Sequence, residues 1–290
     1  MVAVLAALGG LAAPAAADEP RGWRPDVAAA RAYAAGRQGE VAFAVRTRHR
    51  RWSYRPDAAY RSASVVKAML LVAYLRRADV RGRALRTGER ALLDPMIRRS
   101  ANRAADAVMR QVGTGRLAAL GRRAGMRHFA PYPVYWGGST ITAADQARFF
   151  LRIDRFVPRR HRAYAMQLLR TVIPGQRWGI AAAVPHGWRV AFKGGWGRGQ
   201  TRQVDHQAAL LTRDRERVAV AILTADNPSD GYGFATIQGV AARLLHGLER
   251  RVVGEVHRGR ARIRAAISGT LASWPTISIA SSSSTSTAPW

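Results

Sequence analysis

Alternating hydrophobic and small or polar positions predict strands near both ends of the chain. Residues 41–45 read Val-Ala-Phe-Ala-Val, and a second strand is expected at 52–54 after a short turn. The alternation returns at 188–193, and residues 206–212 can pair with 218–224 across the turn between them. The last three segments therefore predict an antiparallel meander.

Helical patterns fill the rest of the chain. An alanine-rich helix is expected at 26–35, and a final helix at 232–248 carries a single apolar stripe. Between 64 and 169 helical segments dominate, with breaks at 113–115 and 131–138. The predicted fold class is α/β of the α+β type: an antiparallel sheet from both chain ends, flanked by helices, with an inserted all-helical lobe. We expect a site between the two lobes.

These patterns place the two lobes in one folded domain, residues 18–250. The sheet lobe comprises 25–63 and 176–250, and the helical lobe comprises 64–175. Residues 251–290 are basic at first and then rich in Ser and Thr. Such a composition buries too little apolar surface to offset its ordering entropy, so we predict a disordered tail. The tail either binds a surface, such as the cell wall, or has no role.

The N-terminal segment predicts export. Residues 2–17 carry no charge and close on three alanines before Asp18, which is typical of a signal peptide spanning residues 1–17. The segment is too short to span a bilayer, which needs about 20 apolar residues. The alternative is a disordered alanine-rich leader. We expect a secreted or extracytoplasmic protein, associated with the cell wall if the tail binds it.

The amino-acid composition excludes several kinds of site and partner. The 290 residues include 47 Lys+Arg and 18 Asp+Glu, a net charge of +29, and no cysteine. The missing cysteine excludes disulfides, zinc fingers and a thiol nucleophile. The histidines form no zinc-protease motif, so neither a metal nor a cofactor is predicted. The arginines are spread along the chain without a nucleic-acid recognition motif, which favours anionic cell-wall polymers over nucleic acid as a partner.

Only Lys67 and Lys193 are lysine, and this makes them the first candidates for chemistry, because a desolvated ammonium can lose its proton whereas a guanidinium stays charged. Ser64 precedes Lys67 by three residues at the start of an apolar helical run. That spacing puts the two side chains on one helix face, where a neutral amine can activate a hydroxyl. The structural alternative is Ser64 as a helix N-cap with Lys67 extending into solvent.

Two further motifs accompany this pair. Ser100 and Asn102 precede a helix expected from Asn102 to Val112, where both could simply serve as capping residues. Lys193-Gly194-Gly195-Trp196 follows a strand; two glycines there indicate a turn, or room for a substrate backbone beside the strand. Both lysines of the chain fall in these three motifs.

The order S-x-x-K, S-x-N, K-G-G resembles the penicillin-recognising serine hydrolases, closest to the class A beta-lactamase-like group. The resemblance covers about residues 26–248. It implies Ser64 as the acyl-forming nucleophile, Lys67 as its base and Ser100 as a proton shuttle to the leaving nitrogen.

The same resemblance implies substrate-binding roles for other residues. Asn102 would position the substrate, and Lys193 would hold its carboxylate and bias the hydroxyl network. The backbone N–H groups of Ser64 and Trp196, beside Gly194 and Gly195, would form the oxyanion hole. Arg202 would add a carboxylate contact, unless it is an ordinary surface arginine.

The chain departs from the family in ways that bear on turnover. Ala101 replaces the aspartate of S-D-N, and residues 107–144 contain no Asp or Glu, although class A enzymes carry their deacylating glutamate on a loop there. Asp145, the next acid, is expected to help cap a helix that starts after Thr142. We therefore expect an exported serine hydrolase that acylates on beta-lactam or D-alanyl peptide-like amides and deacylates slowly. The alternative is a non-catalytic protein of this fold that binds wall peptides or a partner.

Overall fold

The computed structural model describes residues 19–20, 22–199 and 202–249. The predicted signal peptide, residues 1–17, and the predicted tail, residues 251–290, lie outside these ranges. Five antiparallel strands form the main sheet in the order β2-β1-β7-β6-β5. The strands are β1 (Glu40–Arg46), β2 (Arg51–Tyr54), β5 (Arg189–Arg198), β6 (Gln203–Arg213) and β7 (Glu216–Asn227). The prediction of a sheet built from both chain ends is confirmed.

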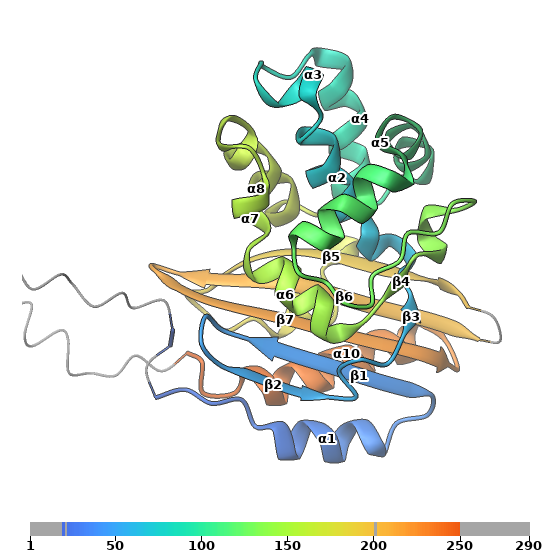
Figure 1. Cartoon of the computed structure of the whole chain (residues 1–290). Helices are drawn as coiled ribbons and strands as arrows, with labels where there is room; N and C mark the ends of the chain where they lie inside the picture. Colours follow the sequence, from blue (N-terminus) through green and yellow to red (C-terminus); the bar gives the residue numbers. More distant parts are fainter. Residues whose placement is uncertain (1–18, 21, 200–201, 250–290) are drawn as a thin grey trace, which may run out of the picture. The chain divides into compact units, whose positions relative to one another are not determined.

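Helices cover both faces of this sheet (Figure 1). The first and last helices, α1 (Val27–Ala35) and α10 (Asp230–Leu245), lie side by side on one face. The inserted segment lies on the other face. Its longer helices are α2 (Lys67–Leu75), α4 (Thr87–Arg98), α5 (Asn102–Arg123), α6 (Ala143–Leu151) and α8 (Arg162–Arg170). Its short helical turns are η1 (Ala63–Val66), α3 (Ala78–Arg81), η2 (Trp136–Gly138), α7 (Ile153–Phe156), η3 (Arg159–His161) and η4 (Pro174–Gln176). The short helix α9 (Ile180–Ala183) follows the insertion and packs against α10.

The alternation along β1 sorts side chains by size between the two faces. Val41, Phe43 and Val45 pack in the core with α1 and α10, whereas Ala42 and Ala44 join the core of the helical lobe. Because alanine projects little from a strand, α6 can pack directly against β1 and β7. The sequence therefore builds two cores on opposite faces of one sheet.

Helix α2 forms the centre of the helical lobe. Every one of its nine residues is buried, including Lys67, and it packs against α4, α5 and α8. A helix that is apolar all round must be enclosed by its neighbours. Because the apolar run after Ser64 must be enclosed, α2 lies in the middle of the helical lobe. The first motif, at the start of α2, is positioned with it.

The structure differs from the predicted elements in three places. Strand β5 does not end at Lys193 but continues through both glycines to Arg198, because β6 pairs with it throughout. The break expected at 113–115 is a kink inside α5, where Gly113 has φ 71° and ψ 160°. The final helix is α10, so the prediction of 232–248 is wrong at its end: His246 leaves the helical conformation, although Leu248 stays buried.

The helical insertion also contains one short strand that the pattern does not predict. Strand β4 (Thr140–Ile141) pairs with β3 (Tyr60–Arg61), so a second, two-stranded sheet ties the insertion to the chain just before η1. Ser62 continues this tie, since its backbone N–H donates to the Ser139 carbonyl at 2.8 Å. Within the described ranges no helix has the length and apolar character needed to cross a membrane.

Candidate active site

Ser64 lies inside η1, the turn that leads into α2. Ser64 as a residue retains 9% exposure, whereas Lys67, the first residue of α2, is fully buried. The cap position of η1 is Ser62 and that of α2 is Val66, and neither makes a side-chain cap bond. The alternative of Ser64 as an N-cap with Lys67 in solvent is therefore wrong. Lys67 is completely enclosed, whereas Ser64 keeps a small exposed area.

Ser100 occupies the junction between α4 and α5 in a left-handed conformation, with φ 57°. Such a backbone is unfavourable for a residue with a side chain, by about 1 kcal/mol or more. It directs both the carbonyl and the hydroxyl of Ser100 toward the buried lysines. Ala101 is the N-cap of α5 and makes no side-chain cap bond, so the capping interpretation of Ser100 and Asn102 is also wrong.

Lys67 is held by three oxygens. Its Nζ donates to the Ser100 carbonyl at 2.5 Å and to Asn102 Oδ1 at 2.8 Å, and lies 3.3 Å from Ser100 Oγ. A neutral amine has two N–H bonds and one lone pair. The two short contacts can use both N–H bonds, which leaves the lone pair free to accept a proton from a hydroxyl.

The protonation of Lys67 is set by its surroundings. Burial lowers the pKa of its ammonium to about 7, against a smaller opposing effect of the Asp106 carboxylate. The indole of Trp136 lies over Nζ, 4.4 Å from the ring centroid, and replaces water there. A large share of Lys67 is therefore neutral at physiological pH, as a base requires.

Lys193 enters the same cluster from β5. Its buried Nζ donates to Ser100 Oγ at 3.0 Å and to the Gly194 carbonyl at 2.8 Å. Burial, and then the neighbouring charge of Lys67, lower the pKa of Lys193 well below its ordinary value. Because Ser100 Oγ accepts from this amine, its own proton remains available to a third group.

The second glycine of the third motif brings the edge strand β5 against η1. A Cβ on Gly195 would lie 2.7 Å from the backbone nitrogen of Ser64 and 2.8 Å from that of Val65. Only a residue without a side chain permits this approach. Gly195 therefore sets Trp196, the next residue of β5, beside the backbone of Ser64.

Three aromatic rings, one of them Trp196 of the third motif, form a cluster beside that motif. Trp178 stacks on Phe234 with ring centroids 3.9 Å apart, and Trp196 meets Trp178 edge-on at 5.9 Å. Gln207 on β6 fixes this segment, since its side chain accepts from Ile180 N–H and donates to the Trp178 carbonyl. A Cβ on Gly194 would come within 3.3 Å of Trp178. All three rings are half-buried, so this end of the site is apolar.

Trp136 and Asp106 are the residues that the sequence analysis missed. Trp136 Nε1 donates to Asp106 Oδ1 at 2.7 Å, and the indole is almost fully buried against Lys67. One signal pointed to Asp106, because it follows Asn102 by four residues and so shares its face of α5. No sequence signal placed Trp136, because the 131–138 segment approaches α2 only through tertiary packing.

The structure brings together Ser64, Lys67, Ser100, Asn102 and the strand 193–196, but not Arg202. Arg202 is exposed on the connection after β5, where its carbonyl accepts from Gly199 N–H at 2.6 Å. Its placement agrees with the alternative that Arg202 is an ordinary surface arginine.

Asp145 also lies outside this cluster. Thr142 caps α6, and the Asp145 carboxylate accepts from the backbone N–H groups of Arg127 and His128. The described residues contain no cluster of three or more metal-ligating side chains of His, Cys, Asp or Glu.

A serine at the start of a buried helix, with a second serine hydroxyl between two buried amines, is the kind of cluster found in a class of protein, the active-site serine hydrolases. Residues 85–248, more than half of the chain, match the model of the beta-lactamase enzyme family. This chain therefore belongs to the beta-lactamase enzyme family and is a serine hydrolase. The matched segment contains the second and third motifs and begins after the first.

Solved structures agree on the fold. The beta-lactamase from Sphaerobacter thermophilus DSM 20745 is 22% identical with a TM-score of 0.68, and the similarity covers 78% of this chain and 98% of that one. The beta-lactamase from Desulfarculus baarsii DSM 2075 is 25% identical with a TM-score of 0.60, over 74% and 97%. A class A beta-lactamase of the last common ancestor of Gram-negative bacteria is 22% identical with a TM-score of 0.65, over 77% and 99%. No curated protein sequence matches this chain.

Proposed function

We propose that this serine hydrolase forms an acyl-enzyme on Ser64 with beta-lactams or with D-alanyl peptide-like amides. Lys67 removes the proton from Ser64 as the hydroxyl attacks the carbonyl carbon. Ser100, whose hydroxyl accepts from Lys193, gives its proton to the leaving nitrogen and is reprotonated through Lys67. The observation that carries this proposal is the buried amine of Lys67, with both N–H bonds engaged and a pKa of about 7, one turn from Ser64.

We propose further that hydrolysis of the acyl-enzyme is slow. Class A enzymes activate the deacylating water with a loop glutamate, and the corresponding segment here carries none. Trp136 from that segment instead covers Lys67, and the neighbouring carboxylate, Asp106, accepts from the indole N–H. An indole N–H group only donates hydrogen bonds, so Trp136 cannot act as the base that activates a water molecule.

The location of the reaction is part of the proposal. We propose that residues 1–17 are removed during export and that the protein acts outside the cytoplasm, where peptide amides of the cell wall are available. The sequence of residues 2–17 supports this, as does the small-residue end of that segment. N-terminal sequencing of the protein secreted by its host should begin at Asp18, and an intact Met1 would contradict export by this route.

The test of acylation is an intact-mass time course with a penicillin. The wild-type mass should rise by the full mass of the drug, because opening the lactam ring releases no fragment, and the adduct should persist for minutes or longer. Ser64→Ala should show no adduct. Ser53→Ala, a serine change on the remote strand β2, should behave as the wild type.

Two results would contradict parts of this proposal. Drug consumption without an adduct would show that deacylation is fast. A residue other than a loop glutamate would then have to activate the water molecule. An adduct that persists in Ser64→Ala would remove the nucleophile from its assigned position. A D-alanyl-D-alanine peptide, tested in the same way, separates the two substrate classes, since only the peptide would release free D-alanine.

A further inference from the structure

Arginine side chains line a hollow between the strands β1 and β7 and the helices that pack on them. The hollow has a volume of about 300 Å³, and seven of its ten lining residues are arginine. They come from β1, from the end of α5, and from α6, α7 and β7. None of the lining residues is acidic. We call this cavity the arginine hollow.

Three arginines of the hollow form no ion pair with another described residue. Arg217 forms an ion pair with Asp154 at 2.6 Å, but Arg46, Arg148 and Arg152 form no ion pair within the described ranges. The Nε of Arg148 is buried and has no hydrogen-bond partner there. A buried donor without an acceptor costs about 1–3 kcal/mol, so an acceptor supplied from outside would be favourable.

The guanidinium groups also act on one another. Burial lowers the pKa of Arg46, and the charges of Arg148, Arg51 and Arg152 lower it further. Arg46 nevertheless stays protonated at neutral pH, because a guanidinium is charged throughout that range. These guanidinium groups therefore repel one another in the folded protein, and a bound anion would reduce that repulsion.

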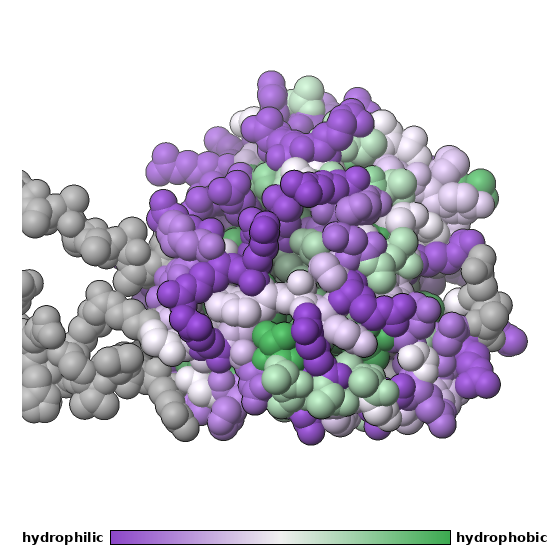
Figure 2. Space-filling view, turned by 60° about the horizontal axis from the view of Figure 1, so that its bottom comes forward, coloured by the Kyte–Doolittle hydropathy of each residue, from purple (hydrophilic) through white to green (hydrophobic). Residues whose placement is uncertain are grey.

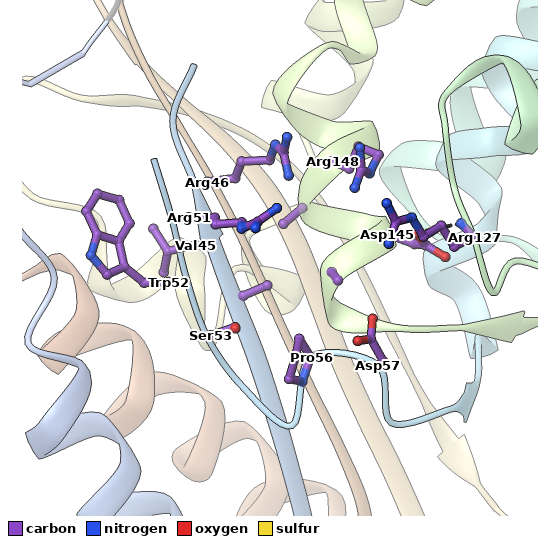
Figure 3. Close-up of a pocket in the computed structure, with 13 residues that line it drawn as sticks. Val45, Arg46, Arg51, Trp52, Ser53, Pro56, Asp57, Arg127, Asp145 and Arg148 are labelled. Atoms are coloured by element: carbon purple, nitrogen blue, oxygen red, sulfur yellow. Dashed lines mark hydrogen bonds between the residues drawn. The ribbon is translucent and has the colours of Figure 1, made fainter. Parts of the chain in front are cut away.

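A second hollow adjoins the first. It shares Arg46 and Arg148 with the arginine hollow and adds Arg51 and Arg127 along its wall (Figure 3). Arg46 and Arg51 extend from the strands toward α6, which carries Arg148. The second hollow also carries two carboxylates, Asp57 and Asp145, and the Asp145 carboxylate already accepts from the backbone N–H groups of Arg127 and His128. Arginine thus outnumbers acid four to two in the second hollow and is the only charged residue type in the first, and the two cavities together form a depression that is longer than a single-ion pocket.

The depression is separate from the catalytic cluster. It lies along β1 and β2, at the opposite edge of the sheet from β5, which carries Lys193. Three strand spacings separate β1 from β5, about 14 Å. Hydrophilic side chains cover much of the face visible in Figure 2, with hydrophobic residues between them.

We propose that the arginine hollow binds a linear anion that carries several phosphate groups, an oligophosphate or a phosphodiester segment. Guanidinium binds phosphate oxygens through two parallel N–H bonds, and several phosphates in a row match several arginines along the depression. A single carboxylate would leave most of the charge uncompensated. The proposal does not depend on the reaction at Ser64.

The test uses the full chain and calorimetric titration with tripolyphosphate at constant ionic strength. We expect saturable binding of one tripolyphosphate, at least tenfold tighter than orthophosphate. Replacing two cations of the hollow (Arg148→Gln with Arg152→Gln) should weaken binding at least tenfold. The matched control (Arg103→Gln with Arg110→Gln), which removes the same charge from the exposed surface of α5, should change it less than twofold.

Three outcomes would overturn the proposal: no saturable binding of tripolyphosphate, equal weakening in both double variants, or binding only to vesicles of phosphatidylglycerol. Equal weakening would mean a diffuse charge effect, and binding only to vesicles would mean that the protein binds a flat lipid surface.

The hollow variant is expected to fold, because removing like charges should leave the melting temperature unchanged or raise it. If the hollow variant unfolds, Arg155→Gln at the exposed rim of the hollow tests the same point, with at least threefold weaker binding expected.

Discussion

At the scale of single residues, the two lysines of this chain converge on one hydroxyl. Ser100 Oγ lies 3.0 Å from Lys193 Nζ and 3.3 Å from Lys67 Nζ. Two ammonium groups that close would repel each other, and burial already disfavours both charges. The neutral form of Lys67 is thus favoured by its location, and the chemistry proposed for Ser64 uses that form.

This protonation predicts a pH dependence of acylation. The pKa of Lys67 is lowered to about 7, so the amine is charged below that pH and cannot accept the proton of Ser64. The second-order rate constant for acylation by a chromogenic cephalosporin should rise with pH through about 7 and level off above it. Stopped-flow measurement between pH 5 and 9 checks this, with Ser53→Ala as the control that keeps the profile. A flat profile from pH 6 to 8 would contradict the role of Lys67.

A second residue-scale prediction concerns stability. Asp205 on β6 is fully buried, and its burial, followed by the charge of Asp230, raises the pKa of its carboxyl from 3.8 to about 7, while a hydrogen bond from Asn227 acts in the opposite direction. The folded protein therefore holds a proton that the unfolded chain releases above pH 3.8. This contribution to stability is complete below pH 3.8 and is lost as the pH rises through about 7.

Asp205→Asn should remove this dependence. We expect the variant to exceed the wild type by about 1–3 kcal/mol in free energy of unfolding at pH 8, with no advantage near pH 4. Urea denaturation at the two pH values measures the difference. Asp57→Asn, a change of an exposed carboxylate, should show no such trend. An Asp205→Asn protein that is less stable than the wild type at pH 8 would show that the buried carboxyl is ionised and paired.

At the scale of elements, the contact between β5 and η1 joins the two halves of the site. This contact depends on one position, Gly195, because its neighbour Gly194 faces a tryptophan ring rather than backbone. A ring at the edge of a half-buried cluster can shift by a few tenths of an ångström, whereas the backbone of η1 is fixed by α2. The two glycines of the third motif are thus unequal, although they look identical in the sequence.

Gly195→Ala should separate the strand from Ser64. We expect a loss of about 1–3 kcal/mol in stability from overpacking and a fall in acylation rate of about 100-fold or more. Gly194→Ala is the matched control, and its acylation rate should stay within about fivefold of the wild type. Neither glycine has a positive φ, so the added Cβ, and not backbone strain, is the variable. Equal effects of the two substitutions would show that the close approach does not position the nucleophile.

At the scale of the whole molecule, the net charge of +29 makes self-repulsion a property of the fold. Salt screens such repulsion, since the Debye length falls from about 10 Å at 0.1 M to about 3 Å at 1 M. The melting temperature should therefore rise with sodium chloride between 0.05 and 0.5 M, by about 3 °C or more. Differential scanning calorimetry measures this, and a fall over the same range would mean that favourable ion pairs such as Arg83–Glu89 outweigh the repulsion.

Much of the fold followed from pattern alone because strands and helices bury residues at different periods. The alternation at 41–45 predicted a strand, and the all-apolar run after Ser64 predicted a buried helix; both are present. The two main errors of extent arise where tertiary contacts overrule local signals. Strand β5 passes through two glycines because β6 pairs with it, and α10 stops at Leu245 because the chain turns at His246.

The sequence by itself determined the order of the elements, the scarcity of lysine and the three motifs, because these are properties of spacing and composition. Only the tertiary structure decided which alternatives hold at those motifs. It buried Lys67, gave Ser100 a left-handed backbone and placed Trp136 over the amine. It also gathered arginines from five elements around one hollow. Contacts between residues far apart in the chain leave no periodic signal, since they depend on how the elements pack rather than on how they form.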